Sequence, residues 1–121
     1  MKINQTTGKK GEDLAENFLK KNGFKVIERN FNGRYGELDI IALDEDVLVF
    51  VEVKTRTSSQ FGNPLEAITS WKLRTLIKTA QFYKLTHQNL PDSLRIDAVG
   101  VELFPSGELK NIELVKNISG F

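Results

Sequence analysis

Cysteine is absent from the 121 residues of this sequence. Its absence excludes disulfide bonds, thiolate metal sites and a cysteine nucleophile, and it is consistent with a reducing cytoplasm. The sequence also has no apolar run long enough to span a bilayer, and its first residues lack the apolar stretch of a secretion signal. We therefore expect a cytoplasmic protein that does not enter a membrane.

A strong net charge is also missing, because the formal charge at pH 7 is only +1. Nucleic-acid-binding domains are usually more basic than this. The charges are unevenly distributed, however, with a net +4 over residues 1–34, −6 over 35–52, +5 over 53–84 and −2 over 85–121. An acidic segment between two basic ones fits either a polyanion-binding surface around a cation site or ordinary solvated charge.

The pattern of apolar residues predicts one α/β domain over residues 1–121. Helical spacing is followed by three extended runs, a second helical segment and two further strands, in the order α-β-β-β-α-β-β. The strand at 47–54 is apolar on both alternating faces, which is typical of a central strand covered by helices on both sides. We expect a mixed sheet of about five strands flanked by helices on both faces, with helices at 9–22 and 63–86 and strands at 24–31, 37–43, 47–54, 94–103 and 109–115.

Three charged residues interrupt the apolar strands 37–43 and 47–54, namely Asp39, Glu52 and Lys54. Side chains alternate along a strand, so Glu52 and Lys54 share a face. If the turn between the strands is Asp44-Glu45, Asp39 lies diagonally from Glu52, and if it is Glu45-Asp46 the two face each other. In both registers the carboxylates are close, whereas a one-residue slip would separate them onto opposite faces.

Charged groups at the end of a central strand need compensation, because burying them unpaired costs several kcal/mol. One solution is an internal ion-pair network, and the other is a site for a hard cation. Carboxylate oxygens without cysteine suit Mg²⁺ or Mn²⁺ better than Zn²⁺ or Cu²⁺. The single histidine, His87, falls in a polar loop after the second predicted helix.

Asp39 followed by Glu52-Val53-Lys54 resembles the D…ExK arrangement of PD-(D/E)xK nucleases, with Leu38 in place of the proline. The segments 8–15, 36–41, 49–56 and 61–64, together with Lys72, resemble the bacterial YraN-type proteins in order and spacing. This largely uncharacterised group is similar to the archaeal Holliday-junction resolvases. The resemblance implies a restriction-endonuclease-like fold.

The resemblance further implies a metal-dependent endonuclease in which Asp39, Glu52 and Lys54 are catalytic. Asp39, Glu52 and Glu12, a glutamate of the first helix, would bind Mg²⁺ or Mn²⁺, although a solvated first-turn glutamate is the alternative for Glu12. Lys54 would orient or deprotonate the attacking water, or stabilise charge on the phosphate. Glu37 either supports the metal ligands or is a charge at the rim of the site.

Several basic residues are candidates for contacting nucleic-acid phosphates. Lys72 lies on the apolar stripe of the second predicted helix, where snorkelling along the apolar surface is the alternative explanation. Trp71, Phe82 and Tyr83 are expected in the core, and Asp97 is expected to have a structural role with a partner such as Arg95. The candidates for phosphate contact are Lys72, Arg56, Arg74, Lys9, Lys10 and Arg29.

The leading hypothesis is an endonuclease for DNA, with branched or junction DNA suggested only by the resemblance to resolvases. The second is a non-catalytic nucleic-acid-binding or adaptor domain that retains the fold, which the small net charge favours. The third is a nuclease for RNA or nucleotides. DNA is favoured over RNA as the partner, and a homodimer is expected because two-fold dimers are the commonest assembly.

Overall fold

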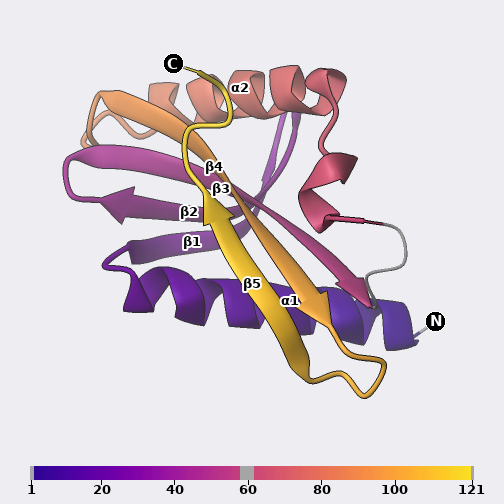
Figure 1. Ribbon diagram of the computed structural model, residues 1–121. Coiled ribbons are helices and arrows are strands. Elements are labelled where there is room, and N and C mark those ends of the chain that lie inside the picture. The colour runs from indigo at the N-terminus through magenta and orange to yellow at the C-terminus, as the bar shows by residue number, and fades with distance from the viewer. Residues whose placement is uncertain (1, 58–61, 121) are drawn as a thin grey trace.

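The computed structural model describes residues 2–57 and 62–120, with side chains from residue 7 onward. Its sheet has five strands in the order β1-β2-β3-β4-β5, in which β3 and β4 are parallel and the other neighbours antiparallel (Figure 1). The predicted α/β fold and its element order are confirmed. The elements are α1 (Lys2–Lys21), β1 (Lys25–Gly33), β2 (Gly36–Asp44), β3 (Val47–Thr57), the 3₁₀ helix η1 (Pro64–Ala67), α2 (Ser70–Leu85), β4 (Ser93–Leu103) and β5 (Leu109–Val115).

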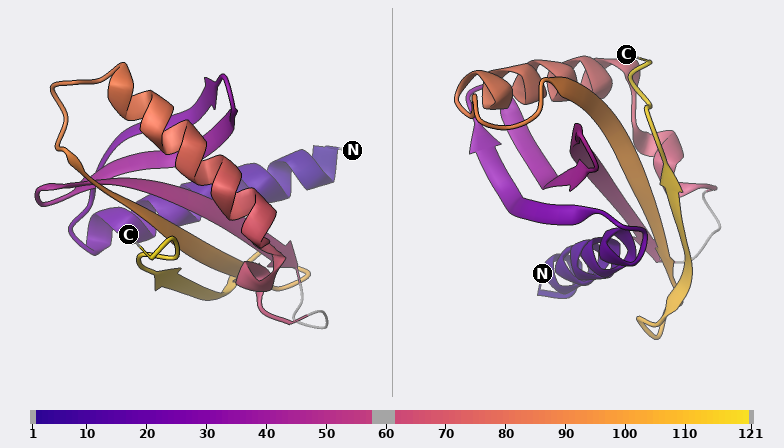
Figure 2. Two further views of the ribbon diagram at one scale, coloured as in Figure 1. Left: turned by 90° about the horizontal axis from the view of Figure 1, so that it is seen from above. Right: turned by 90° about the vertical axis from the view of Figure 1, so that its left-hand side faces the viewer.

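The helices α1 and α2 cover opposite faces of the curved sheet (Figure 2). One apolar cluster joins α1 to the sheet through Ala15, Leu19 and Val51. A second cluster joins α2 to the other face through Leu76 and Phe50. Strand β3 contributes buried residues to both clusters, so the expectation of a central strand covered on both sides is confirmed. No helix in the described residues is both long and apolar enough to cross a membrane.

Helix α1 starts earlier than the sequence predicts, at Lys2, and ends as predicted before Gly23. Gly23 has a φ of 88°, a left-handed conformation that glycine adopts without strain. At the other end of its buried face, Gly11 lies so close to β3 that a Cβ atom there would collide with Thr55. The missing side chain therefore lets α1 approach the carboxyl end of β3 directly.

The prediction of one continuous helix from residue 63 to 86 is wrong, because the structure divides this segment into η1 and α2. Asn63 caps only η1, with its side chain accepting a hydrogen bond from the Leu65 N–H at 2.8 Å. The chain is then extended at Ile68, and Thr69 caps α2 by accepting from the Lys72 N–H at 3.0 Å. A second capping residue so soon after the first offers the backbone a new start, and Leu65 packs on Gly100 of β4.

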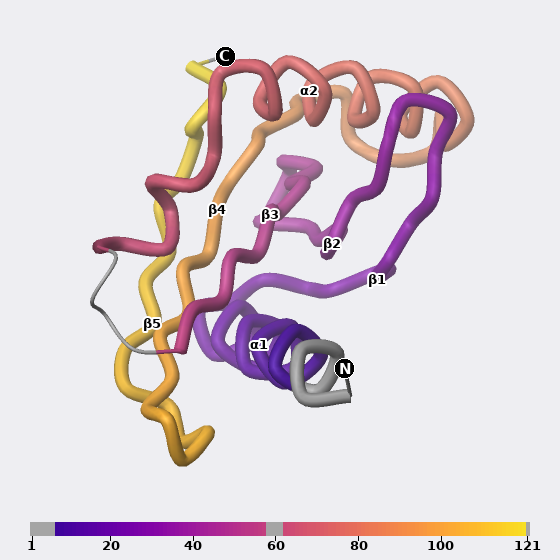
Figure 3. Tube along the Cα trace, turned by 90° about the vertical axis from the view of Figure 1, so that its right-hand side faces the viewer, coloured from indigo at the N-terminus to yellow at the C-terminus, as the bar shows by residue number. Residues whose placement is uncertain are grey.

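The β1–β2 hairpin bends away from β3 toward α2 (Figure 3). Ile40 belongs to the apolar cluster under α1, but Leu38, two residues earlier, belongs to the cluster under α2. The tip of the hairpin meets α2, where the ring centroids of Tyr35 and Phe82 are 6.1 Å apart. Ladder pairing between β2 and β3 begins only at Ile40 opposite Val51, so the strands separate beyond that pair.

Candidate active site

Asp39 lies where β2 separates from β3. The pairs Asp44–Val47 and Ile40–Val51 show that the turn is Glu45-Asp46, the second of the two predicted registers. Continued by one residue, this register puts Asp39 opposite Glu52. The Oδ2 atom of Asp39 accepts a hydrogen bond from the Val53 N–H at 2.8 Å, which substitutes for strand pairing that has ended.

Glu52 is the acidic residue at the centre of the site, with its side chain only 4% exposed. Its Oε2 atom lies 3.6 Å from Nζ of Lys54, two residues further along β3. The same oxygen lies 3.7 Å from Nζ of Lys72, in the first turn of α2. Both distances exceed the usual length of an N–H···O hydrogen bond. Each lysine side chain is about one-third exposed, so the cluster reaches solvent at its basic end.

The two carboxylates are close enough to disturb one another. Burial, followed by the negative charge of Glu52, raises the pKa of Asp39 to about 7. The hydrogen bond from Val53 opposes the rise in pKa, while the more distant charge of Glu12 adds to it. A cation bound between two neighbouring carboxylates stabilises their ionised forms and removes the repulsion between them.

Glu12 is near this pair but is held by another group. Its Oε1 atom accepts a hydrogen bond from Nη2 of Arg29 at 3.1 Å. Arg29 also donates to Asp13 at 2.8 Å and to Glu16 at 3.0 Å, so it is surrounded by three carboxylates of α1. Arg29, a candidate for phosphate contact, therefore forms ion pairs that join β1 to α1.

The carboxylates of the site can supply two protein ligands for a magnesium or manganese ion. Two carboxylates converge, Asp39 and Glu52, but the described residues hold no group of three or more Asp, Glu, His or Cys side chains arranged around one point. Mg²⁺ is commonly bound by one or two carboxylates together with substrate phosphates and water. Glu12 could add a third carboxylate to the site only through an oxygen that is not engaged by Arg29.

The other predicted site residues are dispersed. Glu37 is exposed on β2, Arg56 is half-buried near the end of β3, and Arg74 is exposed on α2. Lys9 forms an exposed pair with Asp13 of α1 at 3.5 Å. Lys10 is exposed on the same helix. The structure thus brings Asp39, Glu52, Lys54 and Lys72 together, with Glu12 beside them, and leaves Lys9, Lys10 and Arg74 outside the cluster.

Trp71 corrects the expectation that the aromatic residues of α2 lie in the core. Tyr83 is buried as expected, and its hydroxyl donates to Glu28 at 2.8 Å. Trp71, in contrast, is 67% exposed. The buried stripe of α2 includes Leu76, Ala80 and Tyr83, and helical spacing places Trp71 on the opposite side. Helical spacing therefore indicates the exposure of Trp71 better than its residue type does.

The fold and this cluster define a small α/β domain with paired carboxylates and two lysines where its central strands separate. A model of the uncharacterised protein family UPF0102 matches residues 11–101, and the chain belongs to this family. A UPF0102 protein of Geobacter metallireducens is 41% identical over 114 residues, covering 94% of this chain and 92% of the relative. One from Dictyoglomus turgidum is 41% identical, covering 94% and 97%. One from Syntrophomonas wolfei is 46% identical over 100 residues, covering 82% and 86%.

Proposed function

We propose that this protein is a metal-dependent endonuclease of the PD-(D/E)xK superfamily that hydrolyses DNA phosphodiester bonds. The observation that carries the proposal is the meeting of the Asp39 and Glu52 carboxylates beside Lys54 on one face of the sheet. Two carboxylates where strands separate can hold a metal ion that assists phosphodiester hydrolysis, and a lysine beside them can stabilise charge that develops on the phosphate. A purely structural network would leave fewer like charges in contact.

Asp39 and Glu52 would hold Mg²⁺ or Mn²⁺, which supplies Lewis-acid polarisation of the phosphate and a more acidic bound water. The hydrogen bond from Val53 fixes Oδ2 of Asp39 and leaves Oδ1 to contact the ion. Lys54, whose Nζ lies 3.6 Å from Glu52, is placed to donate to phosphate oxygens as charge develops on them. Lys72 approaches from α2 and serves the same phosphate group.

The preferred substrate in this proposal is DNA, and branched or junction DNA is included because the sequence motifs resemble those of resolvases. A homodimer belongs to the same proposal, since a junction presents two symmetry-related strands to be cut. Neither feature is specified by the geometry of the carboxylate pair. The basic helix α2, which contains no acidic residue, supports a polyanionic substrate.

The test is cleavage of labelled four-way-junction, nicked and linear duplex DNA in Mg²⁺ or Mn²⁺, with chelator as the blank. Asp39→Asn and Lys54→Ala should each lower the cleavage rate by about 10²- to 10⁴-fold, because each removes a group that acts on the reacting phosphate. Lys21→Ala is the matched control, since Lys21 is an exposed lysine at the far end of α1. It should leave the rate unchanged.

Three results would redirect the proposal. DNA binding without cleavage in either metal would indicate the non-catalytic adaptor, in which Lys54 and Lys72 simply neutralise Glu52. Cleavage confined to RNA would indicate a ribonuclease. Cleavage that survives both Asp39→Asn and Lys54→Ala would place the chemistry elsewhere in the preparation.

A further inference from the structure

The outward-facing side of α2 is basic. The helix contains four basic residues and no acidic one. Lys72 faces Glu52, and Lys84 binds the carbonyl of Leu90 at 2.7 Å. The remaining two, Arg74 and Lys78, are exposed, and in the described part of the chain neither forms an ion pair. Unneutralised cations along one helix are suited to a row of phosphates.

Aromatic side chains lie along the same face. Trp71 is 67% exposed and lies two helical turns before Lys78 on one side of α2. Tyr35, at the tip of the β1–β2 hairpin, is 47% exposed and meets Phe82 edge-on, at an interplanar angle of 82°. The guanidinium of Arg34 lies 5.9 Å from the centre of the Tyr35 ring. Exposed aromatic rings between free cations are the pattern of a stacking surface for nucleobases.

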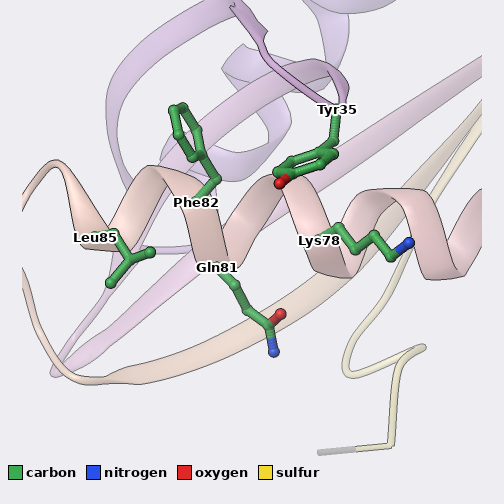
Figure 4. Close-up of a pocket in the computed structure, with 5 residues that line it drawn as sticks. All are labelled: Tyr35, Lys78, Gln81, Phe82 and Leu85. Atoms are coloured by element: carbon green, nitrogen blue, oxygen red, sulfur yellow. The ribbon is translucent and has the colours of Figure 1, made fainter.

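A pocket of about 330 Å³ opens at the meeting point of the hairpin and the helix (Figure 4). Its volume is at the lower end of the range for small-molecule sites, roughly 300–1,000 Å³. Its walls combine aromatic, apolar and polar groups. Gln81 offers an amide that both donates and accepts hydrogen bonds, and Lys78 offers a cation. The lining residues are Tyr35, Lys78, Gln81, Phe82 and Leu85.

We propose that this face of α2 binds single-stranded DNA and that the pocket holds one unpaired nucleobase. The base would stack against Tyr35 and Phe82, with its polar edge at Gln81 and the neighbouring phosphates at Lys78 and Arg74. As a statement about the substrate, the inference rests on the proposed nuclease function. It narrows that function to DNA that presents an unpaired stretch.

The spacing along α2 between the pocket and Lys72, the lysine beside Glu52, is compatible with this proposal. Lys72, which approaches Glu52, precedes Phe82 by ten residues, or about 15 Å along the helix axis. At about 3.4 Å per stacked nucleotide this is four or five steps. A base held in the pocket and a phosphate held at Asp39 and Glu52 therefore fit one short stretch of the same strand. A protein partner would need an acidic surface to match the same face.

The test is fluorescence anisotropy in EDTA, where no cleavage occurs, with a labelled single strand of about 20 nucleotides and a blunt duplex of the same sequence. The wild type should bind the single strand more tightly than the duplex. Tyr35→Ala should weaken single-strand binding by about tenfold, because one stacking contact is lost. Tyr35→Phe keeps the ring and should bind like the wild type. Because the assay contains no free metal ion and measures binding alone, its outcome is independent of whether the protein cleaves DNA.

Phe104 provides a matched control at the other end of the molecule. It is 44% exposed in the loop after β4, and Nζ of Lys110 lies 5.9 Å from its ring centre. Because it shares the aromatic and cationic chemistry but not the location, Phe104→Ala should leave the affinity unchanged. Thermal melts monitored by circular dichroism would confirm that each variant is folded.

Two further measurements keep the inference testable if Tyr35→Ala does not fold. Lys78→Ala changes only an exposed side chain and should lower the slope of log affinity against log salt by about one. Trp71 is the sole tryptophan, so its fluorescence should be quenched when the unlabelled strand is added. Equal affinity for single strand and duplex, or a wild-type affinity in both Tyr35→Ala and Lys78→Ala, would overturn the inference. Failure to bind either DNA would also overturn it and favour an acidic protein partner.

Discussion

Two clusters of charged side chains occupy neighbouring positions on β3 and β4, and they differ in how completely their charges are paired. Asp97 of β4 is fully buried and accepts hydrogen bonds from Arg95 at 2.8 and 2.9 Å and from the Asn117 N–H at 2.9 Å. Arg95 also donates to Asp44 at 2.7 Å. Every contact of Asp97 has hydrogen-bond length, as the prediction of a structural role for it requires.

Glu52 lies one position further along β3 from Val51, the strand neighbour of Asp97, and so faces the other side of the sheet. Its lysine contacts are 3.6 and 3.7 Å long, and a second carboxylate, Asp39, shares its surroundings. Buried charges that serve stability are usually paired to saturation. Like charges left in contact are more typical of functional sites. Glu52 and Asp97 are both buried, so the two clusters differ in the lengths of their charge contacts and not in burial.

The largest expected effect comes from breaking the saturated cluster, which is formed by Asp97, Arg95 and Asp44. Asp97→Ala leaves the part-buried Arg95 without its main partner and should lower the free energy of unfolding by about 3–5 kcal/mol. Lys54→Ala, in the unsaturated cluster, should lower it by less than about 1 kcal/mol, because its ion pair is long and partly solvated. Urea unfolding monitored by circular dichroism measures both. Similar losses in the two variants would remove the distinction between the clusters.

Metal binding should stabilise the folded protein through the Asp39–Glu52 cluster, whose charges are incompletely paired, and not through the Asp97 cluster. At a Mn²⁺ concentration one hundred times its Kd, the wild type should gain about 2.7 kcal/mol, seen as a higher Tm. Asp39→Asn should lose most of this gain because it removes one of the two converging carboxylates. Asp44→Asn, which changes a carboxylate of the saturated cluster, should keep it. A gain that survives Asp39→Asn would place the ion elsewhere.

Gly11→Ala tests how closely α1 must approach the unsaturated site. The new methyl group would collide with Thr55 on β3, so the helix must move, at a cost of about 1–3 kcal/mol. Gly8→Ala is the matched control, since nothing lies within 4 Å of a Cβ there. It should raise stability by roughly 0.5–1 kcal/mol through helix propensity. Thermal melts of the two variants should therefore shift in opposite directions.

The smallest expected effect is the pH dependence of Asp39. Its pKa is raised from 3.8 to about 7 in the folded chain, so folding favours the protonated form. The stabilisation is complete below about pH 4 and is lost as the pH rises through about 7. Without metal, Asp39→Asn should match the wild type near pH 4 and exceed it by about 1 kcal/mol above pH 7, after allowance for solvent screening. An unfolding free-energy difference that is flat with pH would contradict the shared burial of the two carboxylates.

The sequence predicted the parts of the site that depend on local spacing. The double-sided apolar pattern of 47–54 correctly identified the central strand, and alternation correctly placed Glu52 and Lys54 on one face. The register of the preceding hairpin stayed open between two turns, because both offered acidic residues with similar turn preference. The sequence does not reveal the break at Ile68 for a similar reason, since Asn63 and Thr69 are both good caps and local preference does not rank them.

Periodicity and composition were sufficient for the elements, their order and the polarity of each face, because these depend on neighbours within a few residues. Periodicity and composition do not predict contacts between segments that are far apart in the sequence. Lys72 contacts Glu52 because the chain changes direction between η1 and α2. Arg29 binds Glu12 because β1 packs against α1. Such pairings depend on how whole elements pack, and the free energy that selects one packing is spread over the entire core.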